Sequence, residues 1–334
     1  MSTASLATLA ASLREALDAP LDLQNKAERE ARLEIIDMIP ALNRKLIGEV
    51  QTIRDMAWEW LNVLSLKAVS HWSIARYVPL DEQISYTDLS TKCSESKRET
   101  GVSIGFHNPG QTSLYEEVKK IPDRVQRFGL AMALFSSGDG YEPSSLVEGY
   151  DWGKVGGGTI VDVGGGNGFT SSAISDAFPA LKIVVKDIDI DVTDNMETEH
   201  KRPNIQFQKH DFFAPQIVKG ADVYIYRWIF HNWGDDESVK ILQAAIPALK
   251  RGAKILINDG CLPAPGTGHL SEEKTSRNLD ICMMVAMNAK ECEEGDWEAL
   301  FKKADPKFKY LGARRPEGSR MSLIEAKWTG EWSA

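Results

Sequence analysis

The stretch VDVGGGNGF, from Val161 to Phe169, decides the fold. An apolar, strand-like run precedes its glycines at positions 164, 165, 166 and 168, and a helical segment follows them. Because glycine has no Cβ, we expect Gly164, Gly166 and Gly168 to let the backbone turn sharply and approach a bound ligand. A tight turn without a ligand would also select glycine, so that alternative stays open.

The spacing of these glycines argues against one cofactor class. A dinucleotide fingerprint G-x-G-x-x-G starting at Gly164 would need glycine at the position of Phe169. A nicotinamide-dependent oxidoreductase is therefore a distant alternative. Asp162 is unusual inside an apolar strand, and we expect it to help bind the ligand. The alternative is a strand-end carboxylate exposed at the loop.

Strand-like and helical segments alternate on the C-terminal side of Trp152. Helical segments such as SSAISDAF and DESVKILQAAIPALKRG lie between apolar runs rich in Val and Ile, a pattern typical of an α/β fold with a buried, mostly parallel, doubly wound sheet. We place the start of this region near Tyr150. The predicted strands are TIVDVGG, LKIVVKD, NIQFQKHD, ADVYIYRWIF, AKILINDG, KFKYLGA and RMSLIEAKW.

The N-terminal part, up to about residue 145, is helical and poor in strands. Apolar residues recur at spacings of three and four in residues 7–19, in Lys26–Leu42 and in Leu46–Val69. Such stripes predict core or dimer-contact residues more often than a ligand site. Ile84–Cys93 predicts a short strand and a capped helix.

Composition excludes several classes of protein. A net charge of −9 and a pI near 5.3 leave no basic field for nucleic acid. No apolar run approaches the ~20 residues of a membrane helix, and no basic segment precedes the apolar N-terminus as in a signal peptide. The four cysteines form no C-x-x-C pair, which predicts a reduced, cytoplasmic protein without a zinc site.

Acidic residues follow the next two predicted strands. Asp187 ends the second strand, about 20 residues after the glycines, where an acid commonly binds a ribose. Asp211 and Phe212 follow the third strand and could hold an adenine amino group and ring face. An acidic surface loop is the alternative for Asp187. The ordered set predicts a cofactor that contains adenosine.

VDVGGGNG, Asp187, HDFF (210–213) and RWIFHNWGDDESVKIL (227–242) together resemble the S-adenosylmethionine-dependent O-methyltransferases of plant and fungal secondary metabolism. The resemblance covers about residues 110–330. It implies a Rossmann-like methyltransferase domain, residues 111–334, with its last strand antiparallel, and S-adenosylmethionine as cofactor. It also implies a winged-helix-like dimerisation domain, residues 1–110, in a homodimer. Between Cys93 and Gly105 much of that domain is missing, so it is truncated.

The resemblance also implies a base and two acids that orient it. His231 follows the fourth predicted strand, Asp259 ends the fifth, and Glu291 lies in NAKEC. Open α/β sheets bind ligands at this edge, and a carboxylate beside an imidazole fixes its tautomer. The alternatives are an Asp-Gly turn for Asp259 and a solvated helix end for Glu291.

Further binding residues follow from the same resemblance. Arg227 matches a basic residue near the methionine carboxylate, and Trp233 is expected to pack on the adenine unless it is simply core. No metal is implied. Methionines adapt to flat aromatic ligands but at helical spacing serve equally as core. The residues that match the family's substrate cavity are Met132, Phe135, Met283, Met287 and Asn288.

Three functions remain open on this sequence. The favoured one is O-methylation of a phenolic or enolic small molecule with His231 as general base. The second is pericyclisation or dehydration on the same fold. The third is a truncated, non-catalytic binding subunit, which would not need His231, Asp259 and Glu291 together.

Overall fold

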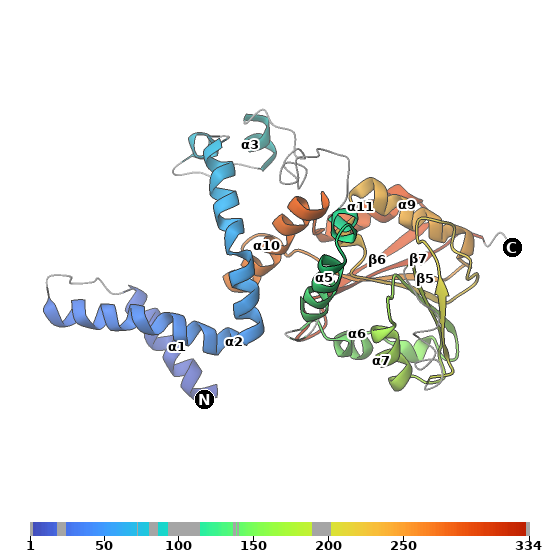
Figure 1. Ribbon diagram of the computed structural model, residues 1–334, viewed down its shortest axis with the longest axis horizontal. Coiled ribbons are helices and arrows are strands. Elements are labelled where there is room, and N and C mark those ends of the chain that lie inside the picture. Colours follow the sequence, from blue (N-terminus) through green and yellow to red (C-terminus); the bar gives the residue numbers. More distant parts are fainter. Residues whose placement is uncertain are drawn as a thin grey trace. The chain divides into compact units, whose positions relative to one another are not determined.

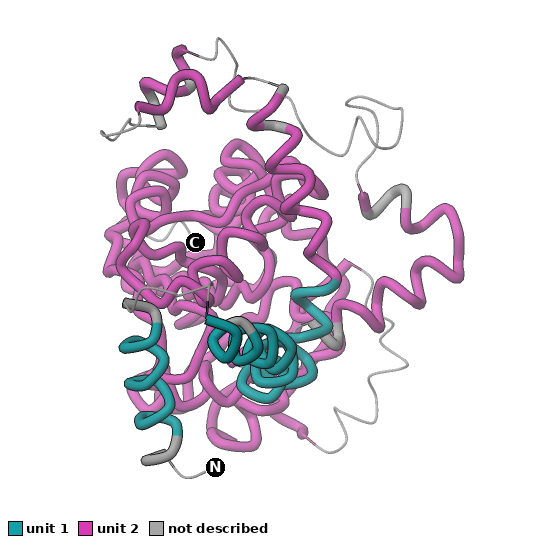
Figure 2. The backbone as a smooth tube through the Cα atoms, turned by 90° about the vertical axis from the view of Figure 1, so that its left-hand side faces the viewer, with its two compact units in different colours: residues 1–56 teal, residues 57–334 magenta. Residues whose placement is uncertain are grey.

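The computed structural model is shown in Figure 1. The residues that it describes are 3–18, 25–71, 73–79, 86–92, 114–135, 138, 140–188 and 202–331. They divide into two compact units, residues 1–56 and residues 57–334 (Figure 2). The domain boundary predicted at residue 110 lies outside the described residues.

The larger unit is built on one sheet with the order β3-β2-β1-β4-β5-β7-β6. β7 pairs antiparallel with both β5 and β6, and the other pairings are parallel. The prediction of a mostly parallel sheet with an antiparallel last strand is confirmed. The strands are β1 Thr159–Val163, β2 Lys182–Asp187, β3 Ile205–Lys209, β4 Val223–Arg227, β5 Lys254–Asp259, β6 Phe308–Arg314 and β7 Ser322–Trp328.

The order of the strands indicates at which edge of the sheet a ligand would bind. From β1 the chain proceeds to β2 and β3 on one side and then returns to β4 and β5 on the other. Ligands of open α/β sheets bind beyond the carboxyl ends of the strands where the order reverses in this way. The glycine loop follows β1 and His231 follows β4, so both lie at this point.

Helices cover both faces of the sheet (Figure 1). α6 (Pro143–Gly149) and α7 (Phe169–Ala177) contribute to the apolar core on one face. α9 (Asp235–Ala245) and α11 (Glu294–Ala304) contribute to the core on the other. These two buried layers hold the strand ends in fixed positions.

The N-terminal region is helical, as expected. α1 spans Thr3–Asp18 and α2 spans Lys26–His71, so the two predicted helices form one, interrupted at Gly48 with a φ of 81°. α3 spans Tyr86–Lys92 within the predicted capped helix. Residues 84–85, where the short strand was expected, and 93–113 lie outside the described residues.

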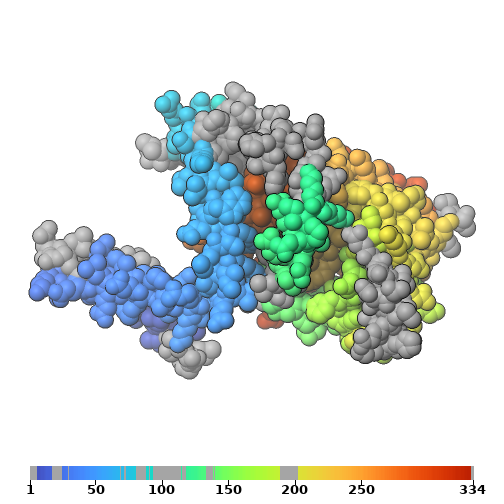
Figure 3. Space-filling model, in the orientation of Figure 1, coloured from blue at the N-terminus to red at the C-terminus, as the bar shows by residue number. Residues whose placement is uncertain are grey.

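Three further helices belong to the larger unit. α4 spans Leu114–Lys119, α5 spans Pro122–Phe135 and α10 spans Leu270–Met287. Figure 3 shows α5 (green) on the surface. Trp58 and Leu61, in the last part of α2, pack with side chains of α10 in a third apolar cluster. None of the described helices is long and apolar enough to cross a membrane.

Candidate active site

The glycine loop after β1 takes a backbone path that excludes side chains. Gly164, Gly166 and Gly168 have φ values of 73°, 53° and 70°, in the left-handed region that favours glycine. A Cβ at Gly164 would lie 2.4 Å from Cδ1 of Ile229, and one at Gly168 would lie 2.8 Å from Cζ of Phe207. The loop therefore needs glycine both for its conformation and for its close packing.

Asp162 is buried directly beneath this loop, with 2% of its surface exposed. Ser171 Oγ donates a 2.6 Å hydrogen bond to its Oδ2, and a Cβ at Gly165 would lie 2.6 Å from its carboxyl carbon. Burial raises the pKa of Asp162 to about 6, although Ser171 and the charge of Arg227 oppose that change. The protein thus keeps a carboxylate at a position where burial makes its charge unfavourable.

The acidic and aromatic residues after β2 and β3 lie near the loop. The Gly166 N–H donates to Asp187 Oδ2 at 3.0 Å, so Asp187 also holds the loop. Asp211 is exposed, and its Oδ1 accepts the Phe213 N–H at 2.9 Å. The rings of Phe212 and Trp233 meet edge to face with centroids 6.0 Å apart. Two predicted aromatic residues from different strand ends therefore come together.

Arg227 is a half-buried cation at the end of β4. It donates to Asn258 Oδ1 and to the carbonyl oxygen of Tyr141. Burial lowers the pKa of Arg227 to about 10, and the charges of Asp162, Asp259 and Glu142 act in the opposite direction. Its positive charge therefore interacts electrostatically with the carboxylates of both Asp162 and Asp259.

His231, Asp259 and Glu291 form one buried cluster, and each offers a ligand-type atom within 4.8 Å of the others. His231 lies in the short 3-10 helix Phe230–Asn232. Its Nδ1 is 3.2 Å from Glu291 Oε1, and its backbone N–H donates to Asp259 Oδ2 at 3.2 Å. The fold therefore brings the three predicted residues together from three separate segments.

The cluster shifts the ionisation of its members. Burial lowers the pKa of His231, but the charges of Asp259 and Glu291 and the Glu291 hydrogen bond outweigh burial, and the net pKa is raised. Burial raises the pKa of Asp259 to about 6. An imidazole that is held by carboxylates in this way is suited to accept a proton.

Contacts from outside the cluster hold the backbone of Glu291 and that of Gly260, the residue after Asp259. The Glu291 backbone N–H donates to Asp280 Oδ1 at 2.9 Å, from α10. The carbonyl oxygen of Gly260, next to Asp259, accepts the Trp297 Nε1–H at 3.3 Å. Sequence reasoning missed Asp280, Trp297 and Gly260 as parts of the site, because none belongs to a recognisable motif.

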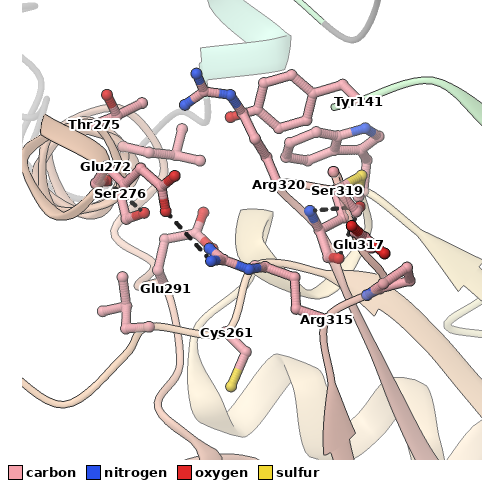
Figure 4. A pocket seen from close by; sticks show the side chains of 17 residues that line it. Tyr141, Cys261, Glu272, Thr275, Ser276, Glu291, Arg315, Glu317, Ser319 and Arg320 are labelled. Carbon is pink, nitrogen blue, oxygen red and sulfur yellow. Dashed lines mark hydrogen bonds and ion pairs between the residues drawn. The ribbon is translucent and has the colours of Figure 1, made fainter. Parts of the chain in front are cut away.

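A cavity of about 420 Å³ adjoins the cluster, in the size range of small-molecule sites (Figure 4). Glu291 and Gly260 line it, together with Tyr141, Trp228 and Arg315. Figure 4 shows Arg315 extended towards Glu272, with which it forms a 3.3 Å ion pair. No sequence motif points to Tyr141 or to the turn between β6 and β7 that carries Arg315.

Trp228 lines this cavity and also packs beside the imidazole of His231. Its ring centroid lies 4.9 Å from that of His231 and 5.3 Å from that of Tyr141. Its φ of 56° is rare for a residue with a side chain, and such strain is commonly found at functional sites. The conformation at Trp228 directs the chain from β4 into the 3-10 helix that carries His231.

The predicted acceptor residues lie elsewhere among the described residues. Met132 is 45% exposed on α5, and the side chain of Phe135 lies outside the described residues. Met283 is buried and Met287 half-buried in the cluster that α10 forms with the end of α2. Asn288 caps α10 with a φ of 54°. The described side chains of Met132, Met283, Met287 and Asn288 do not line the 420 Å³ cavity, so the role of all five residues stays a prediction.

Comparison with known proteins identifies the family. Residues 105–306 match the family model of the O-methyltransferase domain. The chlorophenol O-methyltransferase of Trichoderma longibrachiatum is 32% identical over 390 residues, which cover 93% of this chain and 84% of that protein. The chain belongs to the S-adenosylmethionine-dependent O-methyltransferase family.

A second relative of the methyltransferase is the grayanic acid biosynthesis cluster O-methyltransferase of Cladonia grayi, 32% identical over 374 residues, 94% of this chain and 81% of that protein. Mitomycin 7-O-methyltransferase superposes with a TM-score of 0.56 at 18% identity, over 91% of this chain and all of that one. An O-methyltransferase of neocarzinostatin biosynthesis, solved with S-adenosylhomocysteine and 1,4-dihydroxy-2-naphthoic acid, gives 0.55 at 22% identity, over 68% of this chain and 63% of that one. These superpositions show the shared fold.

The residues of the methyltransferase fit the family's cofactor. The glycine loop has no side chains of its own at 164, 165, 166 and 168, so a ligand can approach its backbone closely, and the buried Asp162 supplies a negative charge that stabilises a sulfonium or ammonium placed opposite it. Phe212 and Trp233 offer aromatic faces and edges for an adenine. His231, Asp259 and Glu291 are also ligand types for a divalent cation, but Glu291 and Asp259 already pair with His231 itself.

Proposed function

We propose that the methyltransferase methylates a hydroxyl group of a small aromatic or polyketide-type secondary metabolite, with His231 as the general base. The observation that carries this proposal is the buried contact of His231 Nδ1 with Glu291 Oε1, beside Asp259. The names of the relatives support the acceptor class, because one acts on a chlorophenol and one was solved with a dihydroxynaphthoic acid.

The chemistry needs little more than positioning and one proton transfer. S-adenosylmethionine supplies an electrophilic methyl group on a sulfonium. A phenol is a poor nucleophile until it loses its proton, and a base with a pKa near neutrality makes that loss easy. His231 accepts the proton at Nε2, while Glu291 accepts the hydrogen of Nδ1 and stabilises the imidazolium. Asp259 fixes the 3-10 helix through the His231 N–H.

The cofactor site that we propose consists of the residues around the glycine loop. Gly164, Gly166 and Gly168 present backbone to the cofactor, and Asp162 carries the charge that opposes its cationic end. Asp187 binds the ribose hydroxyls from the end of β2. The adenine lies near Asp211, Phe212 and Trp233, and the methionine carboxylate near Arg227.

The assembly that we propose is a homodimer through the N-terminal helices, within the proposed dimerisation domain of residues 1–110. Leu33, Ile36 and Ile39 on α2 are 56%, 43% and 52% exposed, so the smaller unit presents a contiguous apolar face. Light scattering coupled to size exclusion tests this: a mass of two chains supports it, and a monomer refutes it. The free thiols Cys261, Cys282 and Cys292 support a cytoplasmic location, which cell fractionation tests.

The comparison supports a truncated N-terminal region. An alignment of 390 residues spans 93% of this 334-residue chain, or about 310 residues. About 80 positions of the relative therefore have no counterpart here. We place this loss between Cys93 and Gly105, where the winged helix would continue.

The proposal is tested by binding followed by turnover. Calorimetry with S-adenosylmethionine and S-adenosylhomocysteine is expected to show micromolar binding of both. A panel of chlorophenols and dihydroxynaphthoic acids is then screened by mass spectrometry for a gain of one CH₂. An acceptor that is consumed without this gain would support pericyclisation or dehydration. Cofactor binding with no acceptor consumed would support a binding subunit, and failure to bind either molecule would refute the proposed site.

A further inference from the structure

We propose that Gly260 is a positioning residue for the base, because its missing side chain leaves the space in which the Glu291 carboxylate contacts His231. This inference rests on the proposed role of His231. It concerns a residue with no chemistry of its own, and it explains why glycine follows Asp259 at the end of β5.

The Glu291 carboxylate occupies the space beside Gly260. A Cβ at Gly260 would lie 2.1 Å from Glu291 Oε2 and 3.1 Å from its Cδ, and the three nearest heavy atoms outside its chain neighbours all belong to Glu291. Gly260 is not among the glycines with positive φ, so its backbone suits alanine. A turn that needs positive φ therefore does not explain why residue 260 is glycine, whereas the close approach of the Glu291 carboxylate does.

The backbone at Gly260 has little freedom to move away. Its carbonyl oxygen accepts the hydrogen bond from Trp297, whose side chain is 1% exposed, and the preceding residue, Asp259, is fully buried in β5. The Glu291 backbone is equally held, by Asp280. A methyl group at position 260 must therefore displace the Glu291 side chain.

The 420 Å³ cavity offers space for the displaced carboxylate, because Glu291 lines it. We expect the side chain to rotate into that cavity and away from His231 Nδ1. Glu291 raises the pKa of His231 both by its hydrogen bond and by its charge. Without these contributions burial weighs more heavily, so the imidazole becomes a weaker base and its tautomer is no longer fixed.

The experiment compares Gly260→Ala with the wild type and with Gly295→Ala. A Cβ at Gly295 meets nothing within 4 Å, so that variant controls for the substitution itself. In Gly260→Ala we expect the pKa of His231, measured by NMR titration of its ring, to fall. We also expect kcat for methyl transfer to fall at least tenfold, with the dissociation constant of S-adenosylmethionine within about twofold of wild type. Gly295→Ala is expected to match the wild type in all three.

A double-mutant cycle shows whether Gly260 acts through Glu291. In a Glu291→Ala background the clash is gone, so adding Gly260→Ala is expected to change kcat less than about twofold. An equal loss in both backgrounds would overturn the inference, as would an unchanged His231 pKa in Gly260→Ala. The NMR measurement needs no acceptor. It therefore decides the inference even if His231→Ala proves fully active, a result that would refute only the general-base proposal.

Discussion

Replacing Asp162 with Asn is expected to stabilise the cofactor-free methyltransferase and to lower its affinity for S-adenosylmethionine. Burial raises the pKa of this carboxyl from 3.8 to about 6, so at neutral pH the folded protein ionises it less readily than the unfolded chain does. Between pH 3.8 and about 6 the carboxyl of Asp162 is protonated in the folded protein but ionised in the unfolded chain. Stability is therefore lost as pH rises from about 4 to 6, and the loss stays constant above that range.

The magnitude follows from the shift of about 2 units. Each unit corresponds to 1.36 kcal/mol, so the ionised carboxylate costs about 3 kcal/mol at pH 7 and about 1 kcal/mol at pH 4.5. Asparagine keeps an oxygen that accepts the Ser171 hydroxyl hydrogen and carries no charge. The pKa of about 6 already includes the attraction between the Asp162 carboxylate and Arg227, so losing that attraction in asparagine needs no separate correction. We therefore expect Asp162→Asn to gain up to about 3 kcal/mol at pH 7, which raises Tm by up to roughly 4 °C.

Differential scanning calorimetry without cofactor, at pH 7.0 and pH 4.5, measures this gain. The exposed Asp37→Asn variant on α2 serves as the control and is expected to change Tm little. Asp162→Asn should also bind S-adenosylmethionine at least tenfold more weakly in calorimetry, because the sulfonium loses a buried countercharge. A Tm for Asp162→Asn that is unchanged or lower at pH 7.0, or a gain that is equal at both pH values, would refute the reasoning.

Three further predictions concern the base. His231→Ala is expected to reduce methyl transfer by at least about 100-fold with cofactor affinity unchanged in calorimetry; a fully active variant would exclude a general base there. Because the pKa of His231 is raised above 6.5 and the base must be neutral, kcat is expected to rise with pH through a midpoint above 6.5, and a flat profile from pH 6 to 9 would contradict this. Glu291→Gly is expected to regain part of its activity with added formate but not with chloride, because the 420 Å³ cavity gives a small carboxylate access to the vacated position; the absence of any formate effect would argue against the role of Glu291.

The sheet was predictable because its strands are almost continuously apolar. Runs such as those ending at Val163 and Asp259 are buried on both faces, and turn residues or polar helices separate them. The short length of these apolar runs and the helical spacing of the segments between them both indicate strands alternating with helices. The position of the polar residues at one edge of the sheet was predictable as well. His231 and Asp259 lie at the same edge because parallel strands end together.

The acceptor side could not be predicted in the same way. Met283 and Met287 repeat at helical spacing, and that pattern is the same whether a helix faces a ligand or another helix. The structure packs Met283 against Trp58 and Leu61, residues that lie more than 200 positions earlier in the chain. No local pattern encodes such a contact. For the same reason Tyr141, which lines the cavity beside Glu291, gave no signal.

The position of β7 has a consequence for the order in which the protein is made. β7 is synthesised after every other strand described, yet it lies inside the sheet between β5 and β6. Asn258, which accepts from Arg227, also donates to the backbone of Ser322 at the start of β7. The growing chain on the ribosome therefore exposes an open edge of β5, and Asn258 lacks its Ser322 acceptor, until β7 has emerged. Premature termination within β7 would produce a protein with a glycine loop and a histidine but without a completed sheet.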